Sequence, residues 1–106
     1  MQWLLILRPV RAEMLTNGPT PEEVRMITEH FSYWQRLVQE GVAFLVGRTQ
    51  TTDPGTIGLA IFRAEDEEAA ALIAQHDPAV AGGVFSFEVR PYAIALLGEP
   101  DSFRPS

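Results

Sequence analysis

The sequence predicts a single α+β domain with the element order strand, helix, strand, strand, helix, strand. Four short apolar runs bounded by turn-forming residues indicate the strands, and two longer segments with apolar residues at steps of three and four indicate the helices. A length of 106 residues with 46% hydrophobic content suits one compact domain. We expect this domain to span residues 1–97, with residues 98–106 as a loosely held tail because they lack periodicity.

The first helix has the strongest local signals in the chain. Thr20 is suited to the N-cap, Pro21 to the first helical position and Glu23 to the third, which together form a capping box. Gly41 is expected to end the helix in the left-handed conformation that glycine adopts most easily. These signals predict a helix over about residues 21–40.

The spacing of apolar residues predicts which side of this helix is buried. The expected buried positions are Val24, Ile27, Phe31, Trp34 and Val38. At about 100° per residue, His30 lies roughly 70° from the centre of that stripe, together with Met26, Tyr33 and Leu37. His30 is therefore expected at the boundary between the core and the solvent.

The remaining elements are shorter. The strands are expected at 2–8, 42–49, 56–63 and 84–90, with a long loop through 11–20 after the first and a hairpin formed by the second and third. The second helix is expected from near Asp66 to His76, because Pro78 disfavours helical geometry in the residue before it. Pro91 is expected to break the last strand, so the apolar segment after it should lie at a sheet edge or a bend.

This order of elements predicts an antiparallel sheet with both helices on one face, the ferredoxin-like βαββαβ arrangement. The second sheet face then lacks a cover, and a chain this short buries only a modest fraction of its surface. We therefore expect a homodimer that packs sheet to sheet as a dimeric α/β barrel, with a cavity near the seam.

Composition argues against several classes of protein. The net charge is −6 and the eight basic residues are arginines scattered along the chain, which disfavours nucleic-acid binding. The absence of cysteine excludes disulfides and fits a reducing cytoplasm. The apolar start has no basic n-region, and no run reaches the ~18 apolar residues of a membrane span, so we expect a cytoplasmic protein. Dinucleotide, P-loop, HExxH and GxSxG motifs do not occur, and no metal or cofactor is expected.

Two longer segments resemble the YCII-related domain family in the order and spacing of their short motifs. They are EHFSYWQRLVQEGVAFLVGRT and DEEAAALIAQHDPAVAGGVFSFEVRPY, and the resemblance covers about residues 2–97. It implies a ferredoxin-like dimer with acid–base chemistry on small molecules. It also implies an active site that pairs a histidine of the first helix with the aspartate of an Asp-Pro motif, matched here by His30 and Asp77. The long loop over 11–20 departs from the family and would reshape the mouth of a cleft.

Pairing these two residues also makes chemical sense without the resemblance. A carboxylate that accepts one imidazole N–H fixes the tautomer and leaves the other nitrogen free as a general base near neutral pH. Each residue also has a structural interpretation. A histidine on a helix shoulder is commonly a satisfied packing residue, and an aspartate before proline commonly bonds backbone amides at a helix exit. His76 suits the end of its helix as imidazolium.

Three further residues are candidates for substrate binding. Tyr33 shares the side of the helix that carries His30, and its hydroxyl could reach a ligand, whereas packing is the simpler role for both Tyr33 and Trp34. Gly47 in a strand indicates a bulge or a close backbone approach. Arg48 could hold an anionic substrate or remain solvated.

Two functions of different classes fit these residues. The first is an enzyme that uses His30 as general acid and base, oriented by Asp77, for proton transfer with elimination or isomerisation in a cleft near the dimer interface. The second is a non-catalytic dimeric module that binds a small ligand or regulatory partner, with both residues in structural roles. They differ in whether the two side chains line an open pocket or are sealed in the core.

Overall fold

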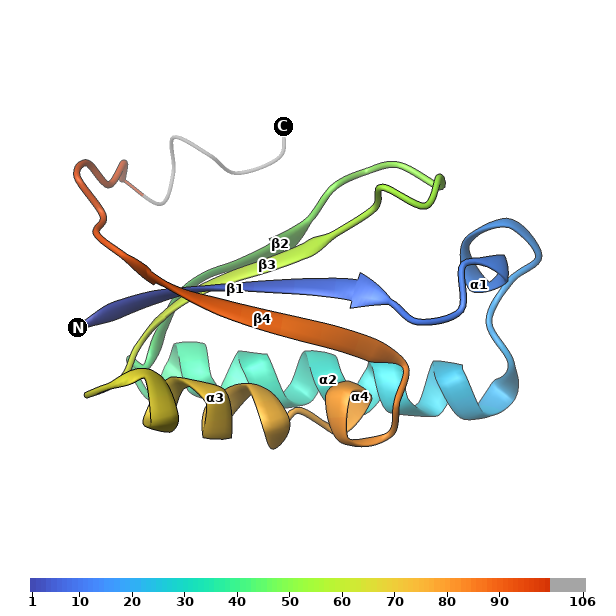
Figure 1. The fold of residues 1–106 in the computed structure, drawn as a ribbon, viewed down its shortest axis with the longest axis horizontal. Coiled ribbons are helices and arrows are strands. Elements are labelled where there is room, and N and C mark those ends of the chain that lie inside the picture. The colour runs from blue at the N-terminus through green and yellow to red at the C-terminus, as the bar shows by residue number, and fades with distance from the viewer. Residues whose placement is uncertain (100–106) are drawn as a thin grey trace.

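The computed structural model describes residues 1–99, and most of the expected tail at 98–106 lies outside the described residues. Figure 1 shows a sheet with helices on one side of it. The elements in chain order are β1 (Gln2–Pro9), α1 (Glu13–Thr16), α2 (Pro21–Gln39), β2 (Ala43–Arg48), β3 (Gly58–Arg63), α3 (Glu67–Gln75), α4 (Pro78–Ala81) and β4 (Phe85–Tyr92). The predicted strands and long helices are confirmed, and the one-turn helices α1 and α4 are additional.

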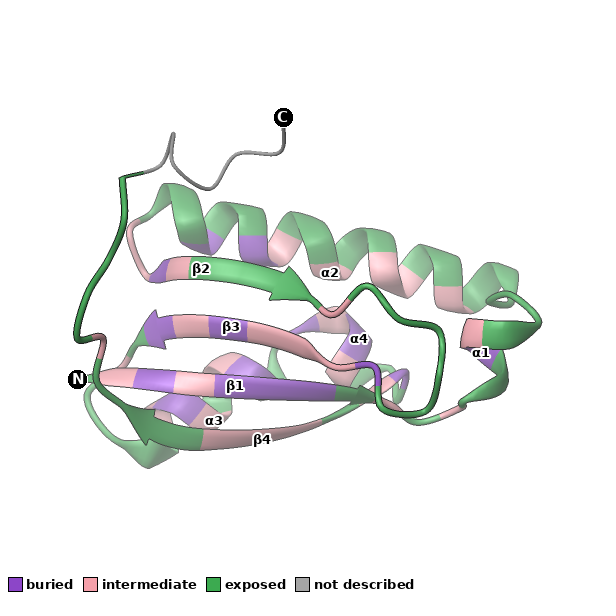
Figure 2. Ribbon diagram, turned by 90° about the horizontal axis from the view of Figure 1, so that it is seen from above, coloured by how far each residue is buried: buried purple, intermediate pink, exposed green. Residues whose placement is uncertain are grey.

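The four strands form one antiparallel sheet in the order β2-β3-β1-β4. Helices α2, α3 and α4 cover the same face of this sheet (Figure 1). This is the split βαβ arrangement that the element order predicts. The opposite face, which Figure 2 shows from above, carries none of the described helices.

The main core lies between the sheet and the helices. Strand residues alternate between faces, so Trp3, Leu5 and Leu7 of β1 point toward the helices, together with Ala60 and Phe62 of β3. They pack against buried residues of α2 and α3, namely Trp34, Leu37, Ala70 and Ala74. A smaller cluster of Met14, Ala79 and Val84 joins α1, α4 and the residue that precedes β4.

The predicted boundaries of α2 are confirmed in atomic detail. The Thr20 hydroxyl accepts the Glu23 N–H at 3.1 Å, and the Glu23 carboxylate accepts the Thr20 N–H at 2.8 Å. Gly41 follows the helix with φ of 77°, the left-handed conformation expected of it.

Glu23 also anchors the segment between β1 and α2. The Arg11 guanidinium donates to both oxygens of Glu23, at 2.6 and 3.0 Å. These bonds, together with the Thr20 amide, lower the pKa of Glu23 from 4.5 to about 2. The segment predicted as a long loop over 11–20 is thus tied to α2 and contains the helix α1, whose Met14 is buried.

Glu23→Gln is expected to remove a pH-dependent contribution to stability. A carboxylate with a lowered folded pKa stabilises the fold fully above its unfolded pKa of 4.5, and this contribution is lost as the pH falls toward 2. The difference in urea midpoint between wild type and Glu23→Gln should therefore shrink as the pH is lowered from 6 to 2. The control is Glu68→Gln, because Glu68 lies in the first turn of α3 and forms no ion pair with a described residue. A difference that stays constant with pH would contradict the assignment.

The predicted buried face of α2 is only partly correct, because several residues on one side of it are exposed. Trp34 is buried as expected, but Val24, Phe31 and Val38 are 48%, 67% and 47% exposed, whereas Leu37 is buried. Helix α2 runs beside the edge strand β2 (Figure 2), so the sheet covers only part of its apolar arc. The spacing of apolar residues fixes which of them share a face but not how far the helix overhangs the sheet.

The predicted break at Pro91 is also wrong, since β4 continues to Tyr92 and Pro91 pairs with Trp3. Because β4 is an edge strand, a residue without an N–H can stand where that group would have faced outward.

Candidate functional site

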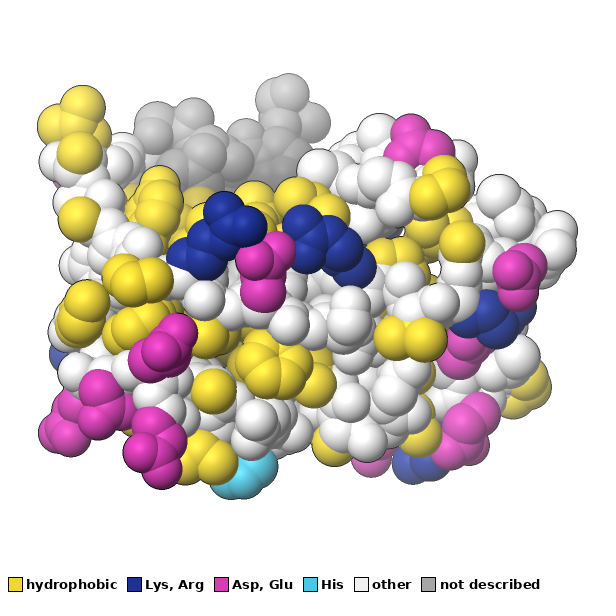
Figure 3. Space-filling model, in the orientation of Figure 1, with side chains coloured by type: hydrophobic (Ala, Val, Ile, Leu, Met, Phe, Trp, Pro, Cys, Tyr) yellow, Lys and Arg dark blue, Asp and Glu magenta, His cyan; other side chains and the backbone are white. Residues whose placement is uncertain are grey.

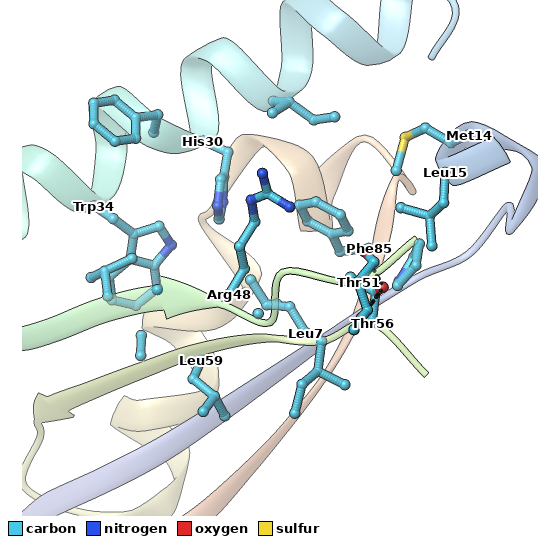
Figure 4. Close-up of a pocket in the computed structure, with 18 of the residues that line it drawn as sticks. Leu7, Met14, Leu15, His30, Trp34, Arg48, Thr51, Thr56, Leu59 and Phe85 are labelled. Atoms are coloured by element: carbon cyan, nitrogen blue, oxygen red, sulfur yellow. Dashed lines mark hydrogen bonds between the residues drawn. The ribbon is translucent and has the colours of Figure 1, made fainter. Parts of the chain in front are cut away.

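A cavity of about 630 Å³ lies between α2 and one end of the sheet. Its walls come from α2, β2, β3, the ends of β1 and β4, and the loop between β2 and β3, and α1 closes one side (Figure 4). Most of the lining side chains are apolar, among them Phe31, Trp34 and Phe85. This volume and character are typical of sites for small molecules.

Asp77 is positioned behind this cavity by the turn between α3 and α4. It is the N-cap of α4, with Pro78 at the first helical position, and its Oδ1 accepts the Ala79 N–H at 2.9 Å. The carboxylate is fully buried, and its Oδ2 contacts His30 Nδ1 at 2.6 Å and accepts the Trp34 Nε1–H at 2.8 Å. Three donors therefore surround a buried carboxylate, the condition under which such a charge is tolerated.

His30 lies between Asp77 and the cavity. Its side chain is 18% exposed and lines the cavity, so its predicted position at the boundary of the core is confirmed. The ring packs edge to face on Phe85 with centroids 5.4 Å apart. Because an ionised Asp77 only accepts hydrogen bonds, Nδ1 carries the proton in the neutral imidazole, and Nε2 holds the lone pair.

The structure brings His30 and Asp77 together across 47 positions of sequence. It also satisfies the structural interpretation of Asp77, since one oxygen caps α4 while the other contacts His30. The cap and the contact with histidine are therefore not alternatives. His30 lines an open cavity and only Asp77 is sealed in the core.

The candidates for substrate binding divide into two groups. Gly47 and Arg48 line the cavity, and the Arg48 side chain extends toward His30 (Figure 4). Tyr33 is not among the lining residues, and its hydroxyl donates to the Ile73 carbonyl at 2.7 Å. Burial raises the pKa of this hydroxyl, and the negative charge of Asp77 raises it further. The role of these three residues in binding stays a prediction.

Trp34 is the site residue whose contribution the sequence did not reveal. It was expected to pack in the core, which it does, but its indole N–H also bonds the same Asp77 oxygen as His30. The signal was available in the spacing, because residues four apart on a helix lie on the same side.

The described residues contain neither a metal-binding cluster nor a membrane-spanning helix. None of their His, Asp and Glu side chains form a group of three or more that could hold a metal ion. Within residues 1–99, no helix is long and apolar enough to cross a membrane.

The fold and the cavity define a small α+β protein with a ligand-sized pocket beside a buried carboxylate. The chain belongs to the YCII-related domain family, whose model matches residues 1–93. The resemblance seen in the sequence is thereby confirmed.

Among solved structures, the chain is similar to 5-chloro-2-hydroxyhydroquinone dehydrochlorinase (TftG) from Burkholderia phenoliruptrix AC1100 in complex with 2,5-dihydroxybenzoquinone. The TM-score is 0.61 at 19% sequence identity, and the match covers 86% of this chain and 93% of that one. At this identity the likeness concerns the fold. No curated protein matches the chain.

Proposed function

We propose that the protein is a small-molecule enzyme in which His30, oriented by Asp77, acts as general acid and base. The observation that carries the proposal is the contact of 2.6 Å between His30 Nδ1 and the buried Asp77 carboxylate, in a histidine that lines the cavity. A catalytic base needs a fixed tautomer and a free nitrogen facing the substrate. The dehydrochlorinase with the same fold, captured with a small cyclic ligand, supports chemistry of this kind.

The chemistry would begin with proton transfer to Nε2. In an elimination, Nε2 takes a proton from a substrate carbon, the C–H electron pair becomes a double bond, and the leaving group departs from the neighbouring carbon with its bonding pair. In an isomerisation, the imidazolium returns the proton to a different carbon. Asp77 stabilises the imidazolium in both cases, and the apolar walls limit access of water.

His30→Gln is expected to reduce turnover by about 10² to 10⁴-fold, the usual contribution of a general acid–base residue. The first compound to test is 5-chloro-2-hydroxyhydroquinone, followed by other cyclic hydroxy compounds with a leaving group, with chloride release as the measurement. His76→Gln is the matched control, because His76 caps α3 and is exposed. If His30→Gln converted a compound as fast as wild type does, His30 would not be the base.

We also propose that the protein is a homodimer that packs through the sheet face away from the helices. Side chains alternate between the two faces along each strand, and residues paired across neighbouring strands point to the same face. This face therefore carries Leu4, Ile6, Ile61 and Leu45. Leu45 is 44% exposed, and covering apolar side chains of this kind is the common reason for sheet-to-sheet association. The position of the cavity relative to the partner stays a prediction.

Leu45→Glu is expected to convert the dimer to a monomer of 11.8 kDa, because the interface would have to bury a charge. Light scattering after size exclusion gives the mass directly. Leu72→Glu places the same charge at a side chain of similar exposure, 46%, on α3, and should remain dimeric. A wild type that is monomeric at micromolar concentration, or a dimeric Leu45→Glu, would contradict the proposed interface.

A further inference from the structure

Arg48 differs from the other arginines in the part of the chain that the structure describes. Ion pairs with Asp or Glu engage Arg8, Arg11, Arg25, Arg36 and Arg90. Arg63 lies over the Phe44 ring at 5.5 Å. On the face shown in Figure 3, basic side chains lie close to acidic ones. Within residues 1–99, Arg48 has neither a carboxylate partner nor a ring contact of this type, although the chain carries a net charge of −6.

The position of Arg48 directs its charge into the cavity. It is the last residue of β2, and its side chain reaches toward His30 and Phe85 (Figure 4). The described residues that line the cavity include neither Asp nor Glu. Two of the lining hydroxyls are already engaged, since Thr51 and Thr56 bond each other at 2.8 Å and Thr56 donates to the Thr51 carbonyl. Arg48 itself is exposed, so its guanidinium lines the cavity while also contacting solvent. Without a counter-ion among the described residues, a guanidinium in this position is a site for an anion.

The remaining walls indicate what else the ligand carries. Phe31, Trp34 and Phe85 present aromatic surface to the cavity, and flat rings pack well on such surface. Among the described residues, His30 is the ionisable group that lines the cavity besides Arg48. A ligand that satisfies all of these features has a ring, one anionic oxygen for Arg48 and a reactive hydrogen toward His30.

We propose that the cavity binds a small cyclic anion, a ring that bears a carboxylate or an acidic hydroxyl ionised at neutral pH, with its anionic oxygens on Arg48. The assignment of the reacting hydrogen to His30 rests on the proposed function, whereas the anion site itself requires only Arg48 and the apolar walls. Arg48 would also stabilise the negative charge that builds up on a conjugated oxygen when His30 removes a proton.

The test compares three probes: benzoate, benzamide with the same ring but no charge, and acetate with the charge but no ring. Dissociation constants come from backbone amide shifts in NMR titrations of wild type and Arg48→Met. This substitution keeps a long, unbranched side chain and removes its charge. We expect benzoate to bind at least about tenfold tighter than benzamide, as a charge-assisted hydrogen bond implies, and tighter than acetate. The preference over benzamide should vanish in Arg48→Met. It should survive in Arg36→Met, whose arginine lies on the exposed side of α2.

Several results would overturn the anion site. They are equal binding of benzoate and benzamide, no detectable binding of benzoate at concentrations up to about 10 mM, or a charge preference that persists in Arg48→Met. Acetate binding as tightly as benzoate would remove the ring from the proposal. His30→Gln separates this proposal from the catalytic one. It should keep benzoate binding while losing turnover, so that failure of either proposal is seen without the other.

Discussion

Asp77→Asn is expected to lower the free energy of unfolding by about 3 kcal/mol, the usual cost of removing one partner from a buried charged contact. The carboxylate is fully buried and surrounded by three donors, and an amide offers one oxygen and one NH2 in its place. Whichever way the amide turns, its NH2 meets an N–H, either that of Ala79 or those of His30 and Trp34. At least one buried N–H, that of Ala79 or that of Trp34, is therefore left without an acceptor.

When the amide turns its NH2 group toward His30, the same substitution should change the protonated nitrogen of the ring. An NH2 group facing the ring can be satisfied only if Nδ1 accepts, which moves the imidazole proton to Nε2 and removes the lone pair that the proposed chemistry requires. Long-range ¹⁵N spectra of the histidine rings distinguish the two tautomers without a substrate. Turnover of any substrate that depends on His30 should fall with the population of the productive tautomer.

Asp66→Asn is the matched control for both measurements. Asp66 caps α3 with a bond of 2.8 Å to the Ala69 N–H, but it is exposed and contacts no histidine. Asparagine and aspartate are equivalent N-caps, so this variant should stay within about 0.5 kcal/mol of wild type. Similar losses in the two variants would mean that Asp77 acts as a helix cap alone.

The features that were correctly predicted from the sequence are determined by residues close together along the chain. The capping box of Thr20 and Glu23 and the left-handed Gly41 are satisfied within one or two turns of the chain, so their residue types suffice. The one-turn helices α1 and α4 were missed for the converse reason. Four residues are too few to stabilise a helix alone, and burial of Met14 and Ala79 against the rest of the fold holds them.

The candidate site was predictable to the extent that it repeats a family pattern. His30 and Asp77 are distant in sequence, and the resemblance suggested their pairing, while the helix period placed His30 correctly at the boundary of the core. The approach of the Arg48 side chain to His30, and the hydrogen bond that the Trp34 indole N–H donates to Asp77, depend on how α2 is rotated against the sheet. That rotation is set by tertiary packing, which also left Phe31 exposed against expectation.

Trp34→Phe is expected to lower the free energy of unfolding by about 3 kcal/mol, through lost ring volume and a lost hydrogen bond to a charged acceptor. Trp3→Phe provides the matched control. Trp3 is also buried, at 3% exposure against 1% for Trp34, but its indole N–H donates to the neutral carbonyl of Ala64 at 3.2 Å. Because both variants lose the same atoms, the excess cost of Trp34→Phe, about 1 kcal/mol, measures the bond to the carboxylate.

A double-mutant cycle decides whether this bond belongs to the site. With Asn at position 77 the carboxylate charge is absent, so Trp34→Phe should then cost no more than Trp3→Phe, and the coupling energy should be about 1 to 2 kcal/mol. Removing the indole donor should also let the His30 ring reorient, because Trp34 and His30 share one oxygen of Asp77. A coupling near zero with unchanged ring ¹⁵N shifts would make Trp34 a packing residue only. Coupling of the expected size would make Trp34 a positioning residue that holds the Asp77 carboxylate against His30.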